Sequence, residues 1–527
     1  MNIGIKYCGG CNPNFDRTAI LNKIMELFKD DKFEYAKENN FYEIVAVING
    51  CGRACSDHLS LKSKEKIFIN SEADYSEAVD LIFKYKNSEQ EVNVLNWKEI
   101  YNKRLMTAEE AVKKIKSKDR VVIGHAVGEP SYVVGKMVEN KEQYENVEIV
   151  HMVAMGKGEY CQPGMEKHFR HNSIFVGGCT RDAVSSGRGD YTPSFFYQVP
   201  KLFRTTMPVD VALVQVTPPD EHGYCSLGVS VDYTKAAAET AKTVIAQVND
   251  RMPRTMGESF VHVSEIDCFV EHSAPIIELG APKIGDVERA IGENCASLIS
   301  DGDTLQLGIG AIPDAVLLFL KDKKDLGIHS EMFSDGVVEL AEAGVVTNKK
   351  KTLHPGKMVV AFLMGSRKLY DYVNNNPMVE MYPVDYVNNP VVIMQNDNIV
   401  SINSCVQVDL MGQVCSESIG LTQISGVGGQ VDFVRGATMA KNGKSIIAMP
   451  STAAKGKLSK IVPLLDEGAA VTTSRNDVDY IVTEFGIAAL KGKTLRERAK
   501  ALIQIAHPDF REGLAMEYEK RFKETYK

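Results

Sequence analysis

The 527-residue chain contains no run of about 18 apolar residues, the length that a helix needs to cross a membrane. Its start, MNIGIKYCGGCNPNFDR, lacks the long apolar segment and the small-residue cleavage site of a secretory signal. The net charge of -8 leaves no excess of positive charge of the kind that binds nucleic acids or anionic membranes. We therefore expect a cytoplasmic protein with no nucleic-acid partner and no membrane partner.

Several catalytic signatures are also missing from the sequence. Neither G-x-x-x-x-G-K-[ST] nor G-x-G-x-x-G occurs, so no site for a nucleoside triphosphate or a dinucleotide is predicted. The 11 histidines are scattered without an H-E-x-x-H pair, and no G-x-S-x-G nucleophile elbow is present. The sequence therefore does not favour ATP-dependent chemistry, a zinc-protease centre or a serine hydrolase.

The composition is otherwise that of an ordinary globular protein, with 44% apolar and 25% charged residues. A chain of this length is expected to form about three domains. We predict a small N-terminal α/β module over residues 1–90, in which short apolar strands alternate with helices. A second domain is predicted over residues 97–285, and a third over residues 286–527.

The 11 cysteines are odd in number and widely spread, which indicates reduced thiols rather than a secreted disulfide framework. Four of them, Cys8, Cys11, Cys51 and Cys55, follow two predicted strands of the N-terminal module. If these strands are parallel neighbours, the four cysteines lie at one edge of the sheet and can meet. Three alternatives stay open: a zinc or iron-sulfur site, thiol redox chemistry, and inert structural thiols.

The second and third domains resemble copies of one another. Each begins with a helix, continues with an apolar strand that exits through a glycine, and returns as a second helix. The strand segments are KDRVVIGHAVGEP and DGDTLQLGIGAIP. Asp119 pairs with Asp303 and Gly124 with Gly308, and both pairs are 184 residues apart (303 minus 119, 308 minus 124). We interpret this pattern as an internal duplication of an open α/β domain.

The strand that follows in each copy differs in one ionisable residue. NVEIVHMVAMG matches DLGIHSEMFSDG when His151 is aligned with His329, and Val153 then stands where the second copy has Glu331. One carboxylate at a strand end, in only one of two similar domains, predicts a single active site at their interface. The alternatives are a solvated loop glutamate for Glu331 and a satisfied core histidine for His329.

Two glycine-bearing turns are candidates for binding an oxyanion or a phosphate. GIGAIP, at 308–313, lies between a predicted strand and a predicted helix, where backbone N-H groups are not covered by side chains. GVGGQ, at 426–430, has the same character. For both segments, the alternative is a tight turn that needs only the backbone freedom of glycine.

Four motifs together resemble the family of acetyl-CoA hydrolases and transferases. They are LQLGIGAIPDA, LGIHSEMFSDG, INSCVQVDLMGQV and SGVGGQVDF, in this order. The resemblance extends from Trp97 to the C-terminus and does not include residues 1–90. It implies two similar α/β domains with the active site between them. It also implies that Glu331 is a nucleophile that forms a glutamyl-CoA thioester.

The resemblance further implies which residues bind the substrates. An asparagine of the segment DYVNNP, Asn388 or Asn389, is expected to contact the carboxylate substrate. Coenzyme A (CoA) and its reacting thioester are expected to lie against Gly308, Ile309, Gly310, Ala311, Ile312, Gly429 and Lys455.

The expected reaction is transfer of CoA from acetyl-CoA, or another short acyl-CoA, to a short acid such as 4-hydroxybutyrate or butyrate. This is ping-pong catalysis through Glu331, with CoA as substrate and covalent intermediate, no permanently bound cofactor and no metal. We also expect a homo-oligomer, either a dimer or a tetramer. The alternatives are an acetyl-CoA hydrolase, an acyltransferase that needs a carrier partner, and a non-catalytic CoA-binding regulator.

Overall fold

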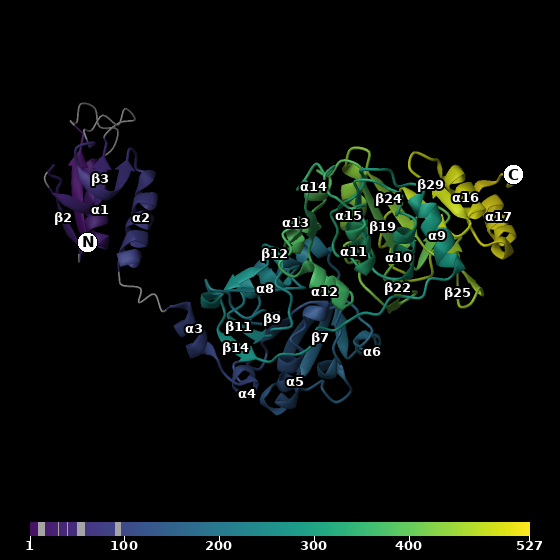
Figure 1. Cartoon of the computed structure of the whole chain (residues 1–527), viewed down its shortest axis with the longest axis horizontal. Helices are drawn as coiled ribbons and strands as arrows, with labels where there is room; N and C mark the ends of the chain where they lie inside the picture. Colours follow the sequence, from purple (N-terminus) through teal and green to yellow (C-terminus); the bar gives the residue numbers. More distant parts are fainter. Residues whose placement is uncertain (9–15, 30, 39, 50–57, 90–95) are drawn as a thin grey trace. The chain divides into compact units, whose positions relative to one another are not determined.

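The computed structural model divides into two compact units, Met1–Asn96 and Trp97–Lys527 (Figure 1). It describes residues 1–8, 16–29, 31–38, 40–49, 58–89 and 96–527. Within these described residues, no helix is long and apolar enough to cross a membrane.

The N-terminal unit is a parallel sheet with two helices. Its elements are β1 (Asn2–Tyr7), α1 (Arg17–Leu27), β2 (Lys32–Tyr35), β3 (Phe41–Ile48), β4 (Lys62–Ile69) and α2 (Asp74–Glu89). The strand order is β2-β1-β3-β4, and all neighbouring strands are parallel. The core joins Ile3, Ile5 and Ile44 of the strands to Ile24 of α1. The α/β prediction for this module is confirmed, whereas the sequence pattern does not predict the edge strand β2.

The strands that precede the cysteines, β1 and β3, are parallel neighbours, as the prediction for these cysteines requires. At their common end, the Cys8 N-H donates a hydrogen bond to the Ile48 carbonyl oxygen (3.1 Å). Cys11, Cys51 and Cys55 lie outside the described residues. The metal, redox and structural alternatives for this group therefore all stay predictions.

The first half of the second unit is built on a seven-stranded sheet. Its strands are β5 (Arg120–Ile123), β6 (Val147–Met152), β7 (Phe169–Phe175), β8 (Gly189–Tyr191), β9 (Val211–Val216), β11 (Thr243–Val248) and β14 (Cys268–Glu271). The order is β14-β11-β9-β5-β6-β7-β8, with every neighbouring pair parallel. All six residues of β9 are buried, as expected for a central strand of a parallel sheet that is covered on both faces.

The helices of this half are short. They are α3 (Trp97–Arg104), α4 (Ala108–Val112), α5 (Ser131–Glu139), α6 (Arg181–Ser185), α7 (Val199–Arg204) and α8 (Thr234–Thr240). Helix α4 begins with a capping box, in which the Thr107 hydroxyl and the Glu110 carboxylate each accept from the other residue's backbone N-H. The helix that opens the first copy therefore starts where the capping residues of the sequence indicate.

The second half is built on a six-stranded sheet. Its strands are β15 (Thr304–Leu307), β16 (Gly327–Ile328), β19 (Ile399–Ser404), β24 (Lys444–Ala448), β28 (Tyr480–Thr483) and β29 (Gly486–Ala489). The order is β16-β15-β19-β24-β28-β29, and only β29 runs antiparallel to its neighbour. The helices are α9 (Asp286–Ala296), α10 (Ala311–Leu318), α11 (Asp335–Glu342), α12 (Arg367–Val373), α13 (Val384–Val387), α14 (Pro390–Ile393), α15 (Gln430–Met439), α16 (Leu495–Gln504) and α17 (Pro508–Phe522).

The two sheets share one strand order, which is what an internal duplication predicts. Five strands of the first sheet, in the order β14-β11-β9-β5-β6, have equivalents in the second sheet in the order β28-β24-β19-β15-β16. Gly124 and Gly308, which were aligned from the sequence, directly follow the equivalent strands β5 and β15. The α/β fold class is confirmed. The predicted boundary between residues 285 and 286 falls inside the second compact unit and stays a prediction.

A small sheet and a common core join the two halves. Strand β12 (Met256–Gly257) of the first half pairs with β18 (Val379–Met381), which in turn pairs with β17 (Met358–Val360). One apolar cluster contains Val122 and Val214 of the first sheet together with Leu305 and Ile402 of the second. The two halves are therefore joined by strand pairing and by a shared apolar core.

Candidate active site

Glu331 lies in the turn between β16 and α11, and its backbone is held from the side of β17. The Ala361 and Phe362 N-H groups both donate to the Glu331 carbonyl oxygen, at 3.0 and 3.1 Å. The neighbouring Ser330 N-H donates to the Val359 carbonyl oxygen (3.0 Å). These bonds fix the main chain at Glu331, and with it the point from which the side chain extends.

The turn that contains Glu331 is also tied to the end of β15. The Ser330 hydroxyl oxygen accepts a hydrogen bond from the Leu307 N-H (3.2 Å) and lies 2.6 Å from the Met332 carbonyl oxygen. Gly308, the first residue of the GIGAIP turn, directly follows Leu307. The glycine turn and the glutamate are therefore neighbours in space.

Within the part of the chain that the structure describes, one side chain donates a hydrogen bond to the Glu331 carboxylate. Asn388 Nδ2 donates to Glu331 Oε2 at 2.7 Å, and the same nitrogen lies 3.5 Å from Asp432 Oδ2. Asn388 is fully buried at the C-terminal end of α13. Because an amide that bridges two carboxylates cannot turn away without losing both contacts, Asn388 fixes the orientation of Glu331.

Gly429, directly before α15, approaches the carboxylate so closely that only glycine fits. A Cβ atom at this position would overlap the Glu331 carboxylate and the Asn388 amide. The φ angle of Gly429 is -91°, which other residues also adopt, so the glycine is required by the close approach and not by its backbone conformation. The absence of a side chain leaves the backbone of Gly429 next to the Glu331 carboxylate.

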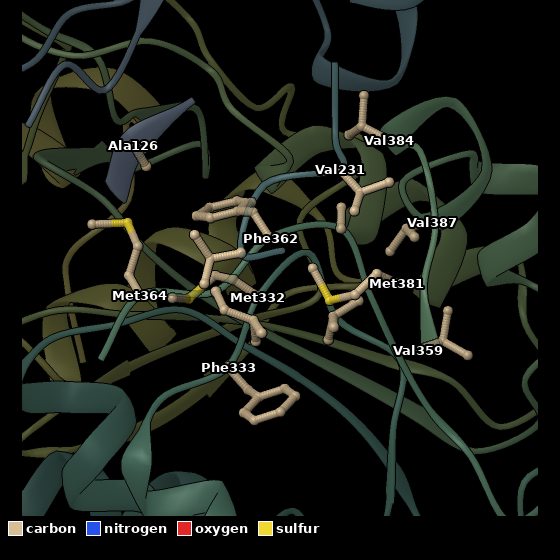
Figure 2. Close-up of a cluster of buried hydrophobic side chains, with 14 of the residues drawn as sticks. Ala126, Val231, Met332, Phe333, Val359, Phe362, Met364, Met381, Val384 and Val387 are labelled. Carbon is tan, nitrogen blue, oxygen red and sulfur yellow. The ribbon is translucent and has the colours of Figure 1, made fainter. Parts of the chain in front are cut away.

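The side chains around the Glu331 turn are largely apolar. Figure 2 shows Met332, Phe333 and Phe362 in a buried hydrophobic cluster. Burial raises the pKa of the Glu331 carboxyl from its ordinary value of 4.5 to about 7. The hydrogen bond from Asn388 is the largest effect in the opposite direction. Glu331 is therefore a carboxyl group whose ionisation falls near neutral pH.

A cavity of about 210 Å³ opens beside the Glu331 carboxylate. Both glycine turns contribute to its wall, through Gly308 and Gly429. The remaining wall includes Phe175, Gln306, Leu307, Met332, Asn403, Ser404, Ser416, Ser425, Gly426, Val427, Gly428 and Gln430. The cavity is thus small, partly polar, and reaches the predicted nucleophile.

The GIGAIP segment forms the turn into α10. Gly310, directly before the helix, has a φ of 112°, a value that favours glycine strongly. Ala311 and Ile312 form the first turn of α10, so the helix starts two residues before Pro313 rather than at the proline. Ile309 and Gly310 line a second, mostly apolar cavity of about 610 Å³ on the other side of this turn.

Two predicted residues lie away from the carboxylate. Asn389 accepts a hydrogen bond from the Val391 N-H (3.0 Å) and caps α14, whereas its neighbour Asn388 contacts Glu331. Lys455 is exposed in the turn of the hairpin formed by β25 (Thr452–Ala453) and β26 (Leu458–Ser459). It is not among the residues that line either cavity.

His329 is part of the protein core. Its Nε2 lies 2.9 Å from the Val387 carbonyl oxygen, and burial lowers its pKa to about 3. The ring therefore stays neutral and contacts the backbone at the end of α13. His329 is therefore a core histidine, as the alternative for this residue states, although its buried Nδ1 has no hydrogen-bond partner among the described residues.

Two family models and several known proteins are similar to this chain. The model of the acetyl-CoA hydrolase/transferase N-terminal domain matches residues 85–279, and that of the C-terminal domain matches residues 365–518. The 4-hydroxybutyrate coenzyme A transferase of Clostridium kluyveri is 72% identical over 429 residues, which are 81% of this chain and 100% of that protein. The chain belongs to the acetyl-CoA hydrolase/transferase family. The resemblance drawn from four motifs is confirmed.

Other members of the acetyl-CoA hydrolase/transferase family match with similar coverage. The butyryl-CoA:acetate CoA-transferase of Anaerostipes caccae is 41% identical over 437 residues, covering 81% of this chain and 98% of that protein. The crystal structure of 4-hydroxybutyrate CoA-transferase from Porphyromonas gingivalis has a TM-score of 0.71 and 49% identity, covering 81% of this chain and all of that one. Residues 2–86 match a separate model, which is described only as an uncharacterized protein family.

The sequence analysis of this family member missed three buried polar residues around the glutamate. Asp432 lies beside Asn388, while His125 Nδ1 lies 3.1 Å from Asp232 Oδ2 in the core of the first half. His125 lowers the pKa of the Glu331 carboxyl, and Asp232 raises it. Asp432 could have been noticed in GVGGQVDF, because it stands three residues after Gly429. No local signal connects His125 and Asp232, which are 107 residues apart.

Proposed function

We propose that this protein transfers CoA between a short acyl-CoA and a short carboxylic acid, with Glu331 as the residue that carries CoA. The observation that carries the proposal is a partly buried carboxylate, held by the Asn388 amide beside a cavity and a glycine turn. Two relatives that this chain matches over nearly their whole length are named for CoA transfer. This chain is therefore best described as a CoA-transferase.

The chemistry explains why the nucleophile should be a carboxylate. Glu331 attacks the carbonyl carbon of the acyl-CoA, the carbon-sulfur bond breaks, and CoA leaves as a thiolate from an acyl-glutamyl anhydride. The thiolate then attacks the glutamyl carbonyl of the anhydride, which releases the free acid as its carboxylate and leaves glutamyl-CoA. The incoming acid reverses both steps. One thioester is exchanged for another, so the transfer balances without ATP and without a net proton.

Each of these steps passes through a tetrahedral oxyanion. The backbone of Gly429 next to the carboxylate, and the turn from Gly308 into α10, are the candidate sources of N-H donors for this charge. Loss of one such donor typically costs about 3 kcal/mol of transition-state stabilisation. Two turns from different parts of the chain line the cavity beside Glu331, which suits a reaction in which the oxyanion forms on the substrate carbonyl and then on the glutamyl carbonyl.

The ionisation of Glu331 fits the same role. With a pKa of about 7, the carboxyl is about half ionised near neutral pH. The rise is due to burial, so the anion is poorly solvated and a stronger nucleophile than an exposed glutamate. Restricted access of water also favours transfer over hydrolysis of the anhydride and the thioester.

The substrates are part of the proposal. We assign acetyl-CoA or another short acyl-CoA as CoA donor and a short acid such as 4-hydroxybutyrate or butyrate as acceptor, on the names of the relatives. The cavity beside Glu331, about 210 Å³, supports a short acid. We propose further that CoA contacts residues 308–312, Gly429 and Lys455, and that Asn388 contacts the carboxylate substrate. The proposal also includes a cytoplasmic location and a homo-oligomer.

The decisive experiment traps the covalent intermediate. The protein is incubated with butyryl-CoA alone, treated with hydroxylamine, digested, and examined by mass spectrometry. We expect a hydroxamate at Glu331 in the wild type and none in Glu331→Gln. Glu342→Gln, which removes an exposed carboxylate of α11, serves as the matched control and should retain the modification. Modification elsewhere, or full transfer activity in Glu331→Gln, would refute the assignment.

A second measurement separates a transferase from a hydrolase. Butyryl-CoA is supplied together with labelled acetate, and labelled acetyl-CoA and free CoA are both quantified. We expect acetyl-CoA to form much faster than free CoA. A larger rate of free CoA release would replace the transferase by a thioester hydrolase that uses the same glutamate.

A further inference from the structure

Asp432 is a second carboxyl group within the site, and the proposed reaction does not use it. It lies in the first turn of α15, three residues after Gly429, and is only 1% exposed. Its Oδ2 accepts a hydrogen bond from the Tyr197 N-H (3.1 Å), and Asn388 Nδ2 lies 3.5 Å from the same oxygen. Asp432 therefore connects the first half of the unit, through Tyr197, to the residue that holds the nucleophile.

Asn388 stands between two carboxyl groups. Its Nδ2 donates to Glu331 at 2.7 Å and faces Asp432 at 3.5 Å. If both carboxyl groups were ionised, two negative charges would share one neutral amide in a buried site. Such a pair is unfavourable, and one member normally keeps its proton.

The charged groups around this pair do not supply a counter-ion for a second negative charge. On α15 itself, the Arg435 guanidinium is 3.4 Å from Asp477 and partly exposed. On the other side of Glu331, the His125 ring is already bound to Asp232. The surroundings therefore favour a single negative charge on the pair, with only one of Glu331 and Asp432 ionised.

Two buried oxygen atoms bear on which form of Asp432 the site favours. Asp432 Oδ1 and Asn388 Oδ1 both lack a hydrogen-bond partner among the described residues. An ionised Asp432 offers only acceptors and would leave Oδ1 as an unpaired, buried, charged atom, whereas a protonated Asp432 supplies an O-H donor. Burial, together with the Glu331 charge, raises the pKa of Asp432 well above its ordinary value, which agrees with this arrangement.

We infer that Asp432 is a positioning residue that stays protonated while Glu331 is the reactive anion. As a neutral acid, it keeps Asn388 against Glu331 without placing a second negative charge beside the nucleophile. It does not touch substrate and transfers no proton to it. The inference rests on the proposed role of Glu331, because that role makes the charge of Glu331 matter.

The test is Asp432→Asn, which keeps the shape of the side chain and removes its ability to ionise. We expect the rate of CoA transfer near neutral pH to stay within about 3-fold of the wild type, with an unchanged acid limb of the pH profile. The wild type should lose activity at alkaline pH, when Asp432 ionises, and Asp432→Asn should not. A purely structural role would leave no difference in the alkaline limb.

Glu342→Gln is the matched control, since it removes an exposed carboxylate of α11 that lies outside the site. It should reproduce the wild-type profile at both limbs. A loss of 100-fold or more near neutral pH in a folded Asp432→Asn protein would overturn the inference, because an ionised Asp432 would then be required. A shift of the acid limb of Asp432→Asn to lower pH would also overturn the inference, because it would mean that an ionised Asp432 normally repels the Glu331 charge.

Infrared spectroscopy provides a readout that does not depend on turnover. A protonated aspartic acid shows a carbonyl stretch that an ionised one lacks. This band should appear in the difference between the spectra of the wild type and Asp432→Asn near neutral pH, in which the contribution of the partly protonated Glu331 cancels. If the band is seen but no covalent adduct forms at Glu331, the proposed function fails and the protonation of Asp432 stands. If the adduct forms and the band is missing, only the inference about Asp432 fails.

Discussion

Substitution of Asn388 by alanine is the sharpest test of how the site controls its nucleophile. Among the described residues, Asn388 donates the one side-chain hydrogen bond to the Glu331 carboxylate, at 2.7 Å. A hydrogen bond to a charged group contributes about 1.5–3 kcal/mol, and about 1.4 kcal/mol corresponds to one unit of pKa. Because the bond stabilises the anion, its loss should raise the pKa of Glu331 from about 7 to about 8–9.

The expected loss of activity follows from this change. Near pH 7, the ionised fraction of Glu331 should fall from about one half to between one tenth and one hundredth, so the rate falls about 5- to 50-fold. Part of this loss should be recovered at alkaline pH, where the carboxyl ionises in the variant as well. The rate that is not recovered then measures the contribution of Asn388 to orientation.

The assay is the pH dependence of kcat/KM for CoA transfer from butyryl-CoA to acetate, which reports the ionisation of the free enzyme. Asn389→Ala is the matched control, because Asn389 caps α14 and does not contact Glu331. It should lose about 1 kcal/mol of stability and keep the wild-type pH profile. An Asn388→Ala enzyme with reduced activity and an unshifted acid limb would refute the electrostatic argument.

Three further predictions follow from the same contacts. Gly429→Ala places a Cβ where the Glu331 carboxylate lies and should lower transfer by 100-fold or more, whereas Gly135→Ala, which has open space in α5, should leave activity unchanged. Glu331→Gln should raise the melting temperature at about pH 8 but not at about pH 4. The reason is that the carboxyl, with its pKa raised from 4.5 to about 7, costs up to about 3 kcal/mol of stability when ionised. Burial lowers the pKa of Lys351 to about 7, so its contribution to stability should rise between about pH 7 and its ordinary pKa of 10.5; Lys351→Met should flatten this rise in thermal unfolding.

The duplication could be predicted because it leaves a signal along the chain. Asp119 and Gly124 recur as Asp303 and Gly308 at one spacing, and the sheets then show the same strand order. The first residue of α10 leaves no such signal, because the positive φ of Gly310, which turns the chain into the helix at Ala311, is a property of the folded turn.

The choice between Asn388 and Asn389 shows the limit of sequence reasoning. The two residues are adjacent and chemically identical, and nothing in DYVNNP separates them. The structure separates them because α13 ends at the first and α14 begins at the second. One side chain therefore turns inward to Glu331, and the other stays at a helix N-terminus.

By itself, the sequence determined the α/β pattern, the repeat, the family and the candidate nucleophile, because hydrophobic periodicity and motif spacing are properties of neighbouring residues. Only the tertiary structure decided what surrounds that nucleophile. The Asn388 amide reaches Glu331 across 57 positions and Asp432 across 44, and the Tyr197 N-H comes from 235 positions before Asp432. Such contacts arise from the packing of two sheets, which brings distant segments together, and no local pattern encodes them.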